Sequence, residues 1–161
     1  MIYILISIIV FIVLIVITPI TVIRLNHAPL MEAPGFFNRL IAFSSTNIAE
    51  TSENHIYPEL RTRYYLESAE SLFDHLIQAV RTLGWEIVSS DSAKKEMQIV
   101  IKTPLWKFRD DMLIRVELID DSHSSLYIRS SSRVGKGDLG ANSGHIHKLY
   151  HTLEKGGINS L

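Results

Sequence analysis

The sequence predicts an α+β fold, in which an antiparallel sheet of about five strands is covered by two helices and follows one N-terminal transmembrane helix. Three observations lead to this prediction. Residues 2–23 are almost entirely apolar and carry no charge. Apolar residues recur at helical spacing in two later segments, and a period-two alternation marks three segments between them. In chain order the soluble part is therefore strand, helix, four strands, helix, or β-α-β-β-β-β-α.

The apolar block at residues 2–23 is predicted to be an uncleaved single-pass anchor whose partner is the lipid bilayer. A helix of about 20 apolar residues matches a hydrocarbon core roughly 30 Å thick. A cleaved signal peptide would show basic residues before a shorter apolar core and a small-x-small site after it, and neither is found here. An all-apolar core helix would be unusual in so small a domain. Tyr3 and Arg24 suit the two membrane interfaces.

The side of the membrane is weakly encoded. Arg24 and Arg39 follow the apolar block, and no basic side chain precedes it. The positive-inside rule therefore favours a cytoplasmic position for the soluble domain.

Composition excludes several classes of site. The chain has no cysteine, which excludes disulfides, thiolate nucleophiles and cysteine-based zinc sites. The net charge is −1 and the basic residues are scattered, so no nucleic-acid partner is expected. No metal site and no cofactor are predicted.

Residues 24–56 are predicted to form a tether and an irregular segment that leads into the domain. Pro29, Pro34 and Gly35 would end any helix that continued from the membrane. An apolar cluster follows, and it either packs on the domain, which we favour, or lies at the lipid surface. The cluster consists of Phe36, Phe37, Leu40, Ile41 and Phe43.

The compact domain is predicted to cover residues 57–157 and to begin with a strand at residues 60–66, which are aromatic and β-prone. Ser68 is a suitable N-cap for the helix that follows, and Gly84 ends that helix. The apolar face of the helix consists of Ala69, Leu72, Phe73, Leu76, Ile77, Val80 and Leu83.

Four more strands are predicted at residues 85–89, 97–103, 112–118 and 126–131. Polar turns at residues 91–94 and 120–124 would join them as hairpins, which makes the sheet antiparallel. The last helix is predicted from Ala141 to Lys155, where Gly156 and Gly157 stop it. The two helices must then cover the apolar face of the sheet.

The most specific motif is the run Arg129-Ser130-Ser131-Ser132-Arg133-Val134-Gly135 with Asp138, Gly140 and Asn142. It resembles the signature of the domain-of-unknown-function 1499 family, a bacterial and plastid group without an assigned activity. Phe108-Arg109-Asp110-Asp111 resembles the Phe-x-Asp-Asp element of that family, and residues 44–58 resemble its opening segment. The resemblance spans about residues 43–154.

The resemblance implies an outward-facing protein, because relatives are commonly lipoproteins or membrane-tethered. This opposes the positive-inside rule, so the side stays open, with a slight preference for an extracytoplasmic domain. Relatives often carry a cysteine pair where this chain has Phe43 and Ile48, which removes any redox role. Relatives also follow the signature asparagine with basic residues, where this chain has Ser143-Gly144-His145, so an anion clamp is not implied.

The spacing Gly135-x-Gly137-x-x-Gly140 matches a dinucleotide fingerprint, but the expected helix after it is the last element, so no βαβ unit can close. We expect a tight strand-to-helix turn with structural glycines and with Asp138 or Asn142 as the helix cap. The other interpretation is an anion site at the start of the helix, assisted by Arg129, Arg133 and Lys136.

Asp110 and Asp111 are expected to lie near Arg129 and Arg133, because counting across the last hairpin places Asp111 beside Ser132 and Arg133. These groups would form either an ion-pair network that fixes the end of the sheet or a polar ligand pocket. The candidate binding residues are therefore Asp110, Asp111, Arg129, Arg133, Asp138 and Asn142.

Two weaker patterns are interpreted as structural. His147 and His151 have metal-ligand spacing, but no further ligand supports a site, and a solvated helix face is expected. Ser130, Ser131 and Ser132 lack the Gly-x-Ser-x-Gly elbow of hydrolases.

The sequence thus predicts a membrane-tethered, non-enzymatic binding or scaffolding domain, with an unknown protein or small molecule as partner. The alternative is a small-ligand or lipid pocket between sheet and helices, with hydrolysis as a further option.

Overall fold

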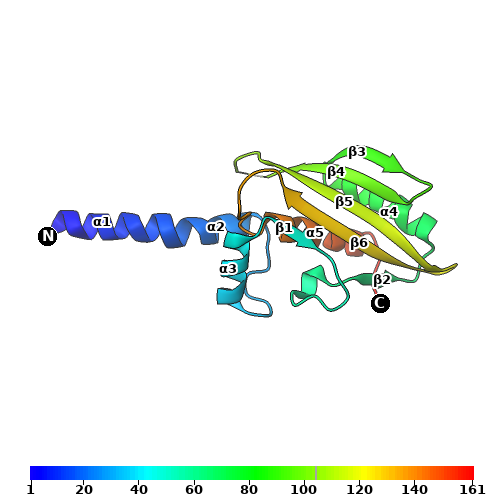
Figure 1. Ribbon diagram of the computed structural model, residues 1–161, viewed down its shortest axis with the longest axis horizontal. Helices are drawn as coiled ribbons and strands as arrows, with labels where there is room; N and C mark the ends of the chain where they lie inside the picture. The colour runs from blue at the N-terminus through cyan, green and yellow to red at the C-terminus, as the bar shows by residue number, and fades with distance from the viewer. Residues whose placement is uncertain (104) are drawn as a thin grey trace.

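The computed structural model describes residues 1–103 and 105–161. A long N-terminal helix projects from a body made of one sheet and the helices that cover it (Figure 1). The projecting helix consists of α1 (Ile2–Ile12), a π-helical stretch (Val13–Ile17) and α2 (Thr18–Leu25). Together these 24 residues are long and apolar enough to cross a membrane. All side chains from Met1 to Thr18 are exposed, whereas Val22 and Ile23 are buried in the body.

The sheet is antiparallel and six-stranded, with the order β1-β6-β5-β4-β3 and with β2 also paired to β6. Its strands are β1 (Ile48–Glu50), β2 (Arg63–Tyr65), β3 (Glu86–Asp91), β4 (Glu96–Lys102), β5 (Arg109–Asp120) and β6 (His123–Ser132). The long strand β6 pairs with β1 near its C-terminal end and with β2 near its N-terminal end. The predicted hairpins are confirmed, and aspartates hold their turns, since Asp91 accepts hydrogen bonds from the backbone N–H of Lys94 and Asp120 from that of Ser122.

Two helices, α4 (Ala69–Thr82) and α5 (Ala141–Lys155), lie together on one face of the sheet (Figure 1). Both were predicted, and the Ser68 hydroxyl caps α4 by accepting a hydrogen bond from the Ser71 N–H. Their apolar faces and the inward side chains of β4, β5 and β6 form the main core. The largest fully buried apolar side chains of that core are Tyr65, Leu72, Phe73, Leu76, Met97, Ile99, Met112, Ile114, Leu126 and Tyr150.

The segment between the apolar helix and the sheet is more ordered than expected. Residues 36–45, predicted to be irregular, form helix α3 (Phe36–Ser45), and β1 follows it. The strand predicted at residues 60–66 is shorter, because a 3-10 turn at Pro58–Leu60 precedes β2. The expectation that the apolar cluster packs on the domain holds for Phe36, Leu40 and Phe43, whereas Phe37 and Ile41 are exposed. A second core joins Ile23, Ala28, Leu30 and Phe43, with Leu139 beside them.

A buried ion pair fixes α3 to the body. Arg39 is fully buried, and its Nη1 donates to Glu59 Oε1 at 2.6 Å. Its Nη2 donates to Glu59 Oε2 at 2.9 Å, and the Ser143 hydroxyl of α5 donates to the same carboxylate at 2.8 Å. The guanidinium also donates to the carbonyl oxygens of Glu32 and Ala33. Every charge of the pair is therefore partnered, which is the condition for tolerating it in a core.

Candidate functional site

The six residues singled out in the sequence do not form one cluster. Successive side chains of a strand point to opposite faces of a sheet. Asp110 of β5 is therefore in the core with Met112 and Ile114, while Asp111 lies on the open face. The predicted single site divides into an outer group of Asp111, Arg129 and Arg133 and an inner group of Asp110, Asp138 and Asn142.

The outer group is a set of surface ion pairs. As the hairpin count predicted, Arg133 reaches Asp111, and its Nε and Nη2 donate to the two carboxylate oxygens at 2.9 and 2.7 Å. The residue opposite Asp111 is Ser131, however, and Ser132 lies opposite Asp110. The pairing with Arg133 lowers the pKa of Asp111. Both side chains are about half exposed, so the pair stabilises the fold by at most about 1 kcal/mol. Arg129 lines the same shallow hollow of the open face as Asp111 and Arg133, but its ion pair is with Glu50, at 3.6 Å.

Asn142 is a buried clamp rather than the helix cap. Its side-chain oxygen accepts a hydrogen bond from the Ser130 hydroxyl at 2.6 Å. Its amide nitrogen donates to Ser132 Oγ and to the backbone carbonyl of Asn47, both at 2.9 Å. Asn142 thus joins α5 to β6 and to the residue before β1. The hydroxyls of Ser130 and Ser132, which a serine hydrolase would use as nucleophiles, are both hydrogen-bonded to Asn142.

The N-cap residue of α5 is Gly140, and the Asp138 side chain lies just before it and bonds the first turn of the helix. Its carboxylate accepts hydrogen bonds from the backbone N–H groups of Gly140 at 2.8 Å and Asn142 at 3.0 Å. Burial raises the pKa of Asp138, while these hydrogen bonds act in the opposite direction. The protein's own carboxylate fills the position that an anion would take at this helix start, so the anion interpretation loses its support.

The glycine motif is a close-packed turn. A Cβ on Gly137 would lie 2.2 Å from the carbonyl oxygen of Ser44 in α3, so only glycine fits there. Gly140 has a φ of +77°, in the region that favours glycine. All strand pairs among the described residues are antiparallel, so the parallel partner of a dinucleotide fold is absent from that part of the chain.

Asp110 has two of the buried polar atoms without a hydrogen-bond partner among the described residues, and the others are His145 Nδ1 and the Tyr150 hydroxyl. Its side chain is fully buried, and neither carboxylate oxygen has a hydrogen-bond partner among the described residues. Burial raises the pKa of Asp110 to about 6, against the effect of the nearby Ser132 hydroxyl, and the charges of Asp138 and Asp111 raise it further. Asp110 therefore keeps its proton to a higher pH than an ordinary aspartate does, and no counter-charge among the described residues is bonded to it.

The nearest basic group to Asp110 is His145 of α5, whose Nδ1 lies 3.7 Å from Asp110 Oδ2. That distance is too long for a hydrogen bond. Burial lowers the pKa of His145 to about 3, helped by the positive charge of Lys148, so the imidazole is neutral at pH 7. His145 packs edge-on against Trp85, with ring centroids 5.8 Å apart. The two residues are neighbours but do not form an ion pair.

A cavity of about 160 Å³ adjoins Asp110 at the end of α2. Its polar lining comes from Asn26, Thr103, Asp110, Ser132 and Asp138. Its apolar walls come from α2, from the loop between β4 and β5, and from the glycine turn, and they consist of Val22, Leu25, Leu105, Trp106, Phe108, Val134, Leu139 and Ala141.

Several lining residues were not anticipated from the sequence. Trp106 is half exposed in a loop and stacks on Phe108 with ring centroids 5.9 Å apart. A Trp-x-Phe pair that ends two positions before Asp110 was the available signal. Asn26 lies in the tether, and nothing local links it to this site. His147 and His151 gather no further ligand, and the described residues hold no cluster that could bind a metal ion.

Comparisons with known proteins add a family but no activity. The family described as a protein of unknown function, DUF1499, matches residues 32–153, which begin after the N-terminal helix. No curated protein matches the chain. A solution NMR structure of a protein from Thermobifida fusca is similar with a TM-score of 0.43 and 8% identity, over 66% of this chain and 93% of that chain. Similarity at that level carries no functional argument.

Proposed function

This chain belongs to DUF1499, a family of proteins of unknown function, and we propose that it is a membrane-anchored protein that binds a small amphiphilic molecule. The proposed site is the cavity at the end of α2, with Asp110 on its wall. The observation that carries the proposal is the unpartnered burial of Asp110, whereas the buried carboxylate of Glu59 and the half-buried carboxylate of Asp138 are both hydrogen-bonded.

The free-energy cost of keeping Asp110 supports a binding role. A pKa of about 6, against the ordinary value of 3.8, corresponds to about 3 kcal/mol of unfavourable free energy when the group ionises in the folded protein. An asparagine or serine at this position would avoid that cost. Perturbed carboxyl groups beside a cavity are typical of binding and catalytic sites.

The ligand class follows from the lining. An ionised carboxylate accepts hydrogen bonds only, so it selects an amine or another donor head group. The walls beside it are aromatic and aliphatic and suit a hydrocarbon body. We therefore propose a ligand with a donor head, preferably an ammonium group, and an apolar chain.

The proposed anchor is the apolar helix, inserted in a lipid bilayer through residues 2–23. The support is its length, its composition and its full exposure up to Thr18. We propose that the domain lies on the extracytoplasmic side. Alkaline extraction of membranes should leave the chain in the pellet, and mass spectrometry of the mature N-terminus should find residues 2–23 present. A soluble chain that starts near residue 24 would contradict the anchor.

A protein partner on the open face of the sheet is the second candidate. Its charged groups already pair within the fold, as Arg133 does with Asp111 and Arg115 does with Glu96. Such paired surface charges have less unused hydrogen-bonding capacity to offer a partner than the carboxylate of Asp110 has. The cavity is therefore the preferred site.

The test compares two adjacent residues of β5. The full chain in lipid nanodiscs is titrated with octylamine, octanol and octanoate, and empty nanodiscs correct for partitioning of each probe into lipid. We expect octylamine to bind best and octanoate least, because Asp110 repels a second carboxylate. Asp110→Asn should weaken octylamine binding at least about tenfold, as expected for loss of a buried charge-assisted contact. Asp111→Asn is the matched control and should leave binding unchanged.

The pH dependence gives a second readout. Octylamine binding should weaken as the pH falls below about 6, where Asp110 takes up a proton. Equal binding of all three probes to wild type and to Asp110→Asn would contradict the proposal.

A further inference from the structure

Exposed apolar side chains gather at the end of the domain from which the N-terminal helix leaves. In the loop between β4 and β5, Leu105, Trp106 and Phe108 are each about half exposed, at 53%, 50% and 49%. In α3, Phe37 is 76% exposed and Ile41 is 66% exposed. These side chains lie outside both hydrophobic cores.

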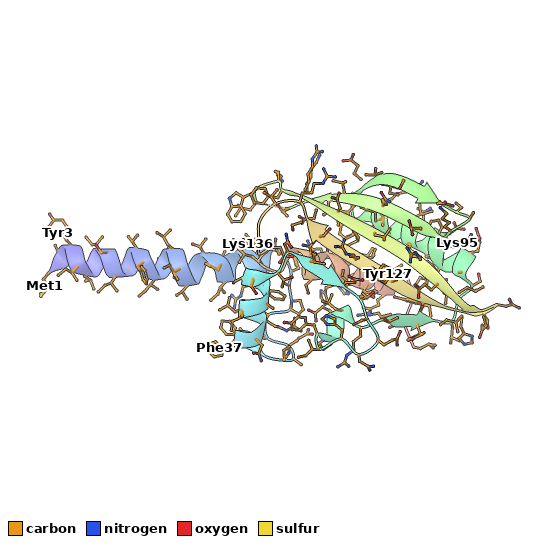
Figure 2. The ribbon with its side chains drawn as sticks, viewed as in Figure 1. Met1, Tyr3, Phe37, Lys95, Tyr127 and Lys136 are labelled. Carbon is orange, nitrogen blue, oxygen red and sulfur yellow. The ribbon has the colours of Figure 1, made fainter. Side chains whose placement is uncertain are left out.

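Both segments are held against the end of the apolar helix. Leu105, Trp106 and Phe108 line the same cavity as Val22 and Leu25, which places the loop beside the last turn of α2. Helix α3 packs on that turn through Phe43 and Ile23 and lies across the axis of the long helix (Figure 1). Figure 2 shows Phe37 pointing away from the sheet, towards the side on which the N-terminal helix projects.

The length of the helix sets the depth of these residues. At 1.5 Å per residue, a hydrocarbon core roughly 30 Å thick takes up about 20 residues. A membrane entered near Ile2 is therefore left near Val22. Side chains packed around Val22 and Leu25 then lie at the level of the lipid head groups, where tryptophan is enriched.

The charges at this end complement an anionic lipid surface. Lys102, Lys107 and Arg109 frame the Trp106 loop, Lys136 lies in the glycine turn close to α2 (Figure 2), and Arg24 is in the last turn of α2. Each of these basic side chains is exposed, and none makes an ion pair among the described residues. Exposed aromatic and basic residues together are typical of surfaces that rest in a membrane interface.

We propose that the β4–β5 loop around Trp106 and the outer face of α3 insert into the head-group region of the bilayer that holds the N-terminal helix. This inference rests on the proposed insertion of residues 2–23. The cavity wall formed by Leu105, Trp106 and Phe108 is then in contact with lipid. An amphiphilic ligand could enter from the membrane without crossing water.

The experiment measures the depth of single tryptophans in the full chain. The protein has two tryptophans, so Trp85→Phe leaves Trp106 as the only reporter. Two further reporters, Phe37→Trp and Ile119→Trp, are placed in a background that carries Trp85→Phe and Trp106→Phe. Ile119 is an exposed residue of β5 near the β5–β6 turn, at the end of the sheet farthest from the N-terminal helix (Figure 1), and is the matched control.

Each variant is reconstituted in vesicles of phosphatidylcholine and phosphatidylglycerol, with and without lipids brominated near the head-group end of the acyl chain. We expect the bromolipids to quench at least half of the fluorescence from positions 106 and 37, with blue-shifted emission, and almost none from position 119. Quenching at position 106 no greater than at position 119 would overturn the inference.

Co-flotation of protein with the vesicles separates this inference from the anchor. Protein that floats with the vesicles while Trp106 stays unquenched keeps the anchor and rejects the insertion of the loop and α3. Protein that does not float rejects both. Thermal unfolding of each variant, followed by circular dichroism, confirms that the substitutions leave the fold intact.

Discussion

Asp110 and Asp111 are consecutive residues of one strand and have opposite environments. Asp111 faces outward, is paired with Arg133, and has a lowered pKa. Asp110 faces inward, has no hydrogen-bond partner among the described residues, and has a pKa raised to about 6. The difference shows that an acidic motif does not by itself define a site. The face of the strand decides which carboxylate is a surface charge and which is buried.

The largest effect should come from breaking a buried pair that is fully satisfied. Arg39→Met leaves the Glu59 carboxylate buried with only Ser143 as a side-chain donor, and we expect a loss of about 3–5 kcal/mol in the free energy of unfolding. Urea denaturation of the full chain in detergent measures this loss. The double variant Arg39→Met with Glu59→Met should recover much of it. A single variant as stable as wild type would remove the contrast between partnered and unpartnered buried charges.

Asp110→Asn should change stability in the opposite direction. Because the folded pKa is above the ordinary value of 3.8, the folded state favours the proton, and wild-type stability falls as the pH rises from about 4 to about 6. At pH 7 the variant should therefore be more stable by about 1–3 kcal/mol, since asparagine avoids the buried charge but keeps unpartnered polar atoms. Denaturation at pH 4 should show the advantage reduced or absent. A variant less stable than wild type at pH 7 would mean that Asp110 is structural.

Asn142→Ala tests the clamp that joins α5 to β6 and to the residue before β1. The change leaves the Asn47 carbonyl and the Ser130 hydroxyl without their buried partner, and we expect a destabilisation of about 1–3 kcal/mol. Octylamine affinity should stay within about twofold of wild type, because the side chain does not line the cavity. A large loss of affinity without a loss of stability would assign Asn142 to the binding site.

Asp111→Asn should give the smallest effect. The lowered pKa means that its stabilisation is present above pH 3.8 and disappears as the pH falls through the folded value. Because the pair with Arg133 is half exposed, the loss at pH 7 should be below about 1 kcal/mol and should shrink in high salt. Thermal melts at two salt concentrations measure it. A larger, salt-independent loss would mean that the Asp111–Arg133 pair contributes more to the free energy of unfolding than its exposure indicates.

The hairpins and the two covering helices could be predicted because their signals are local. Alternation along β5 and β6 sets the faces, and polar turns set the register. The same alternation carried information about the site. Asp110 is two and four positions before Met112 and Ile114, so it lies on the same buried face of β5 as they do. The expectation of one carboxylate–guanidinium cluster treated Asp110 and Asp111 as equivalent. The two-residue period of a strand excludes that equivalence.

Other features could not be read from local patterns. Helix α3 is short and lies between Pro34-Gly35 and a polar stretch, so the spacing of Phe36, Leu40 and Phe43 was interpreted as a cluster rather than as a helix face. Strand β1 has only three residues, too few to show a period. The cavity is assembled from the end of α2, the β4–β5 loop and the glycine turn. The loop follows the end of α2 by about 80 positions in the chain, and the glycine turn follows it by about 110.

The packed last turn of α2 has a mechanical consequence. Val22 and Ile23 are buried in the body, and the Asn26 side chain donates to the Leu139 carbonyl, so the chain passes from the projecting helix into the domain through packed residues. With the helix in a bilayer as proposed, the domain would keep a fixed height above the membrane and a fixed tilt, because no flexible linker joins it to the helix. Its encounters would then be confined to two-dimensional diffusion within a thin layer along the membrane, which raises the collision rate with lipid-borne molecules and disfavours targets deep in the aqueous phase.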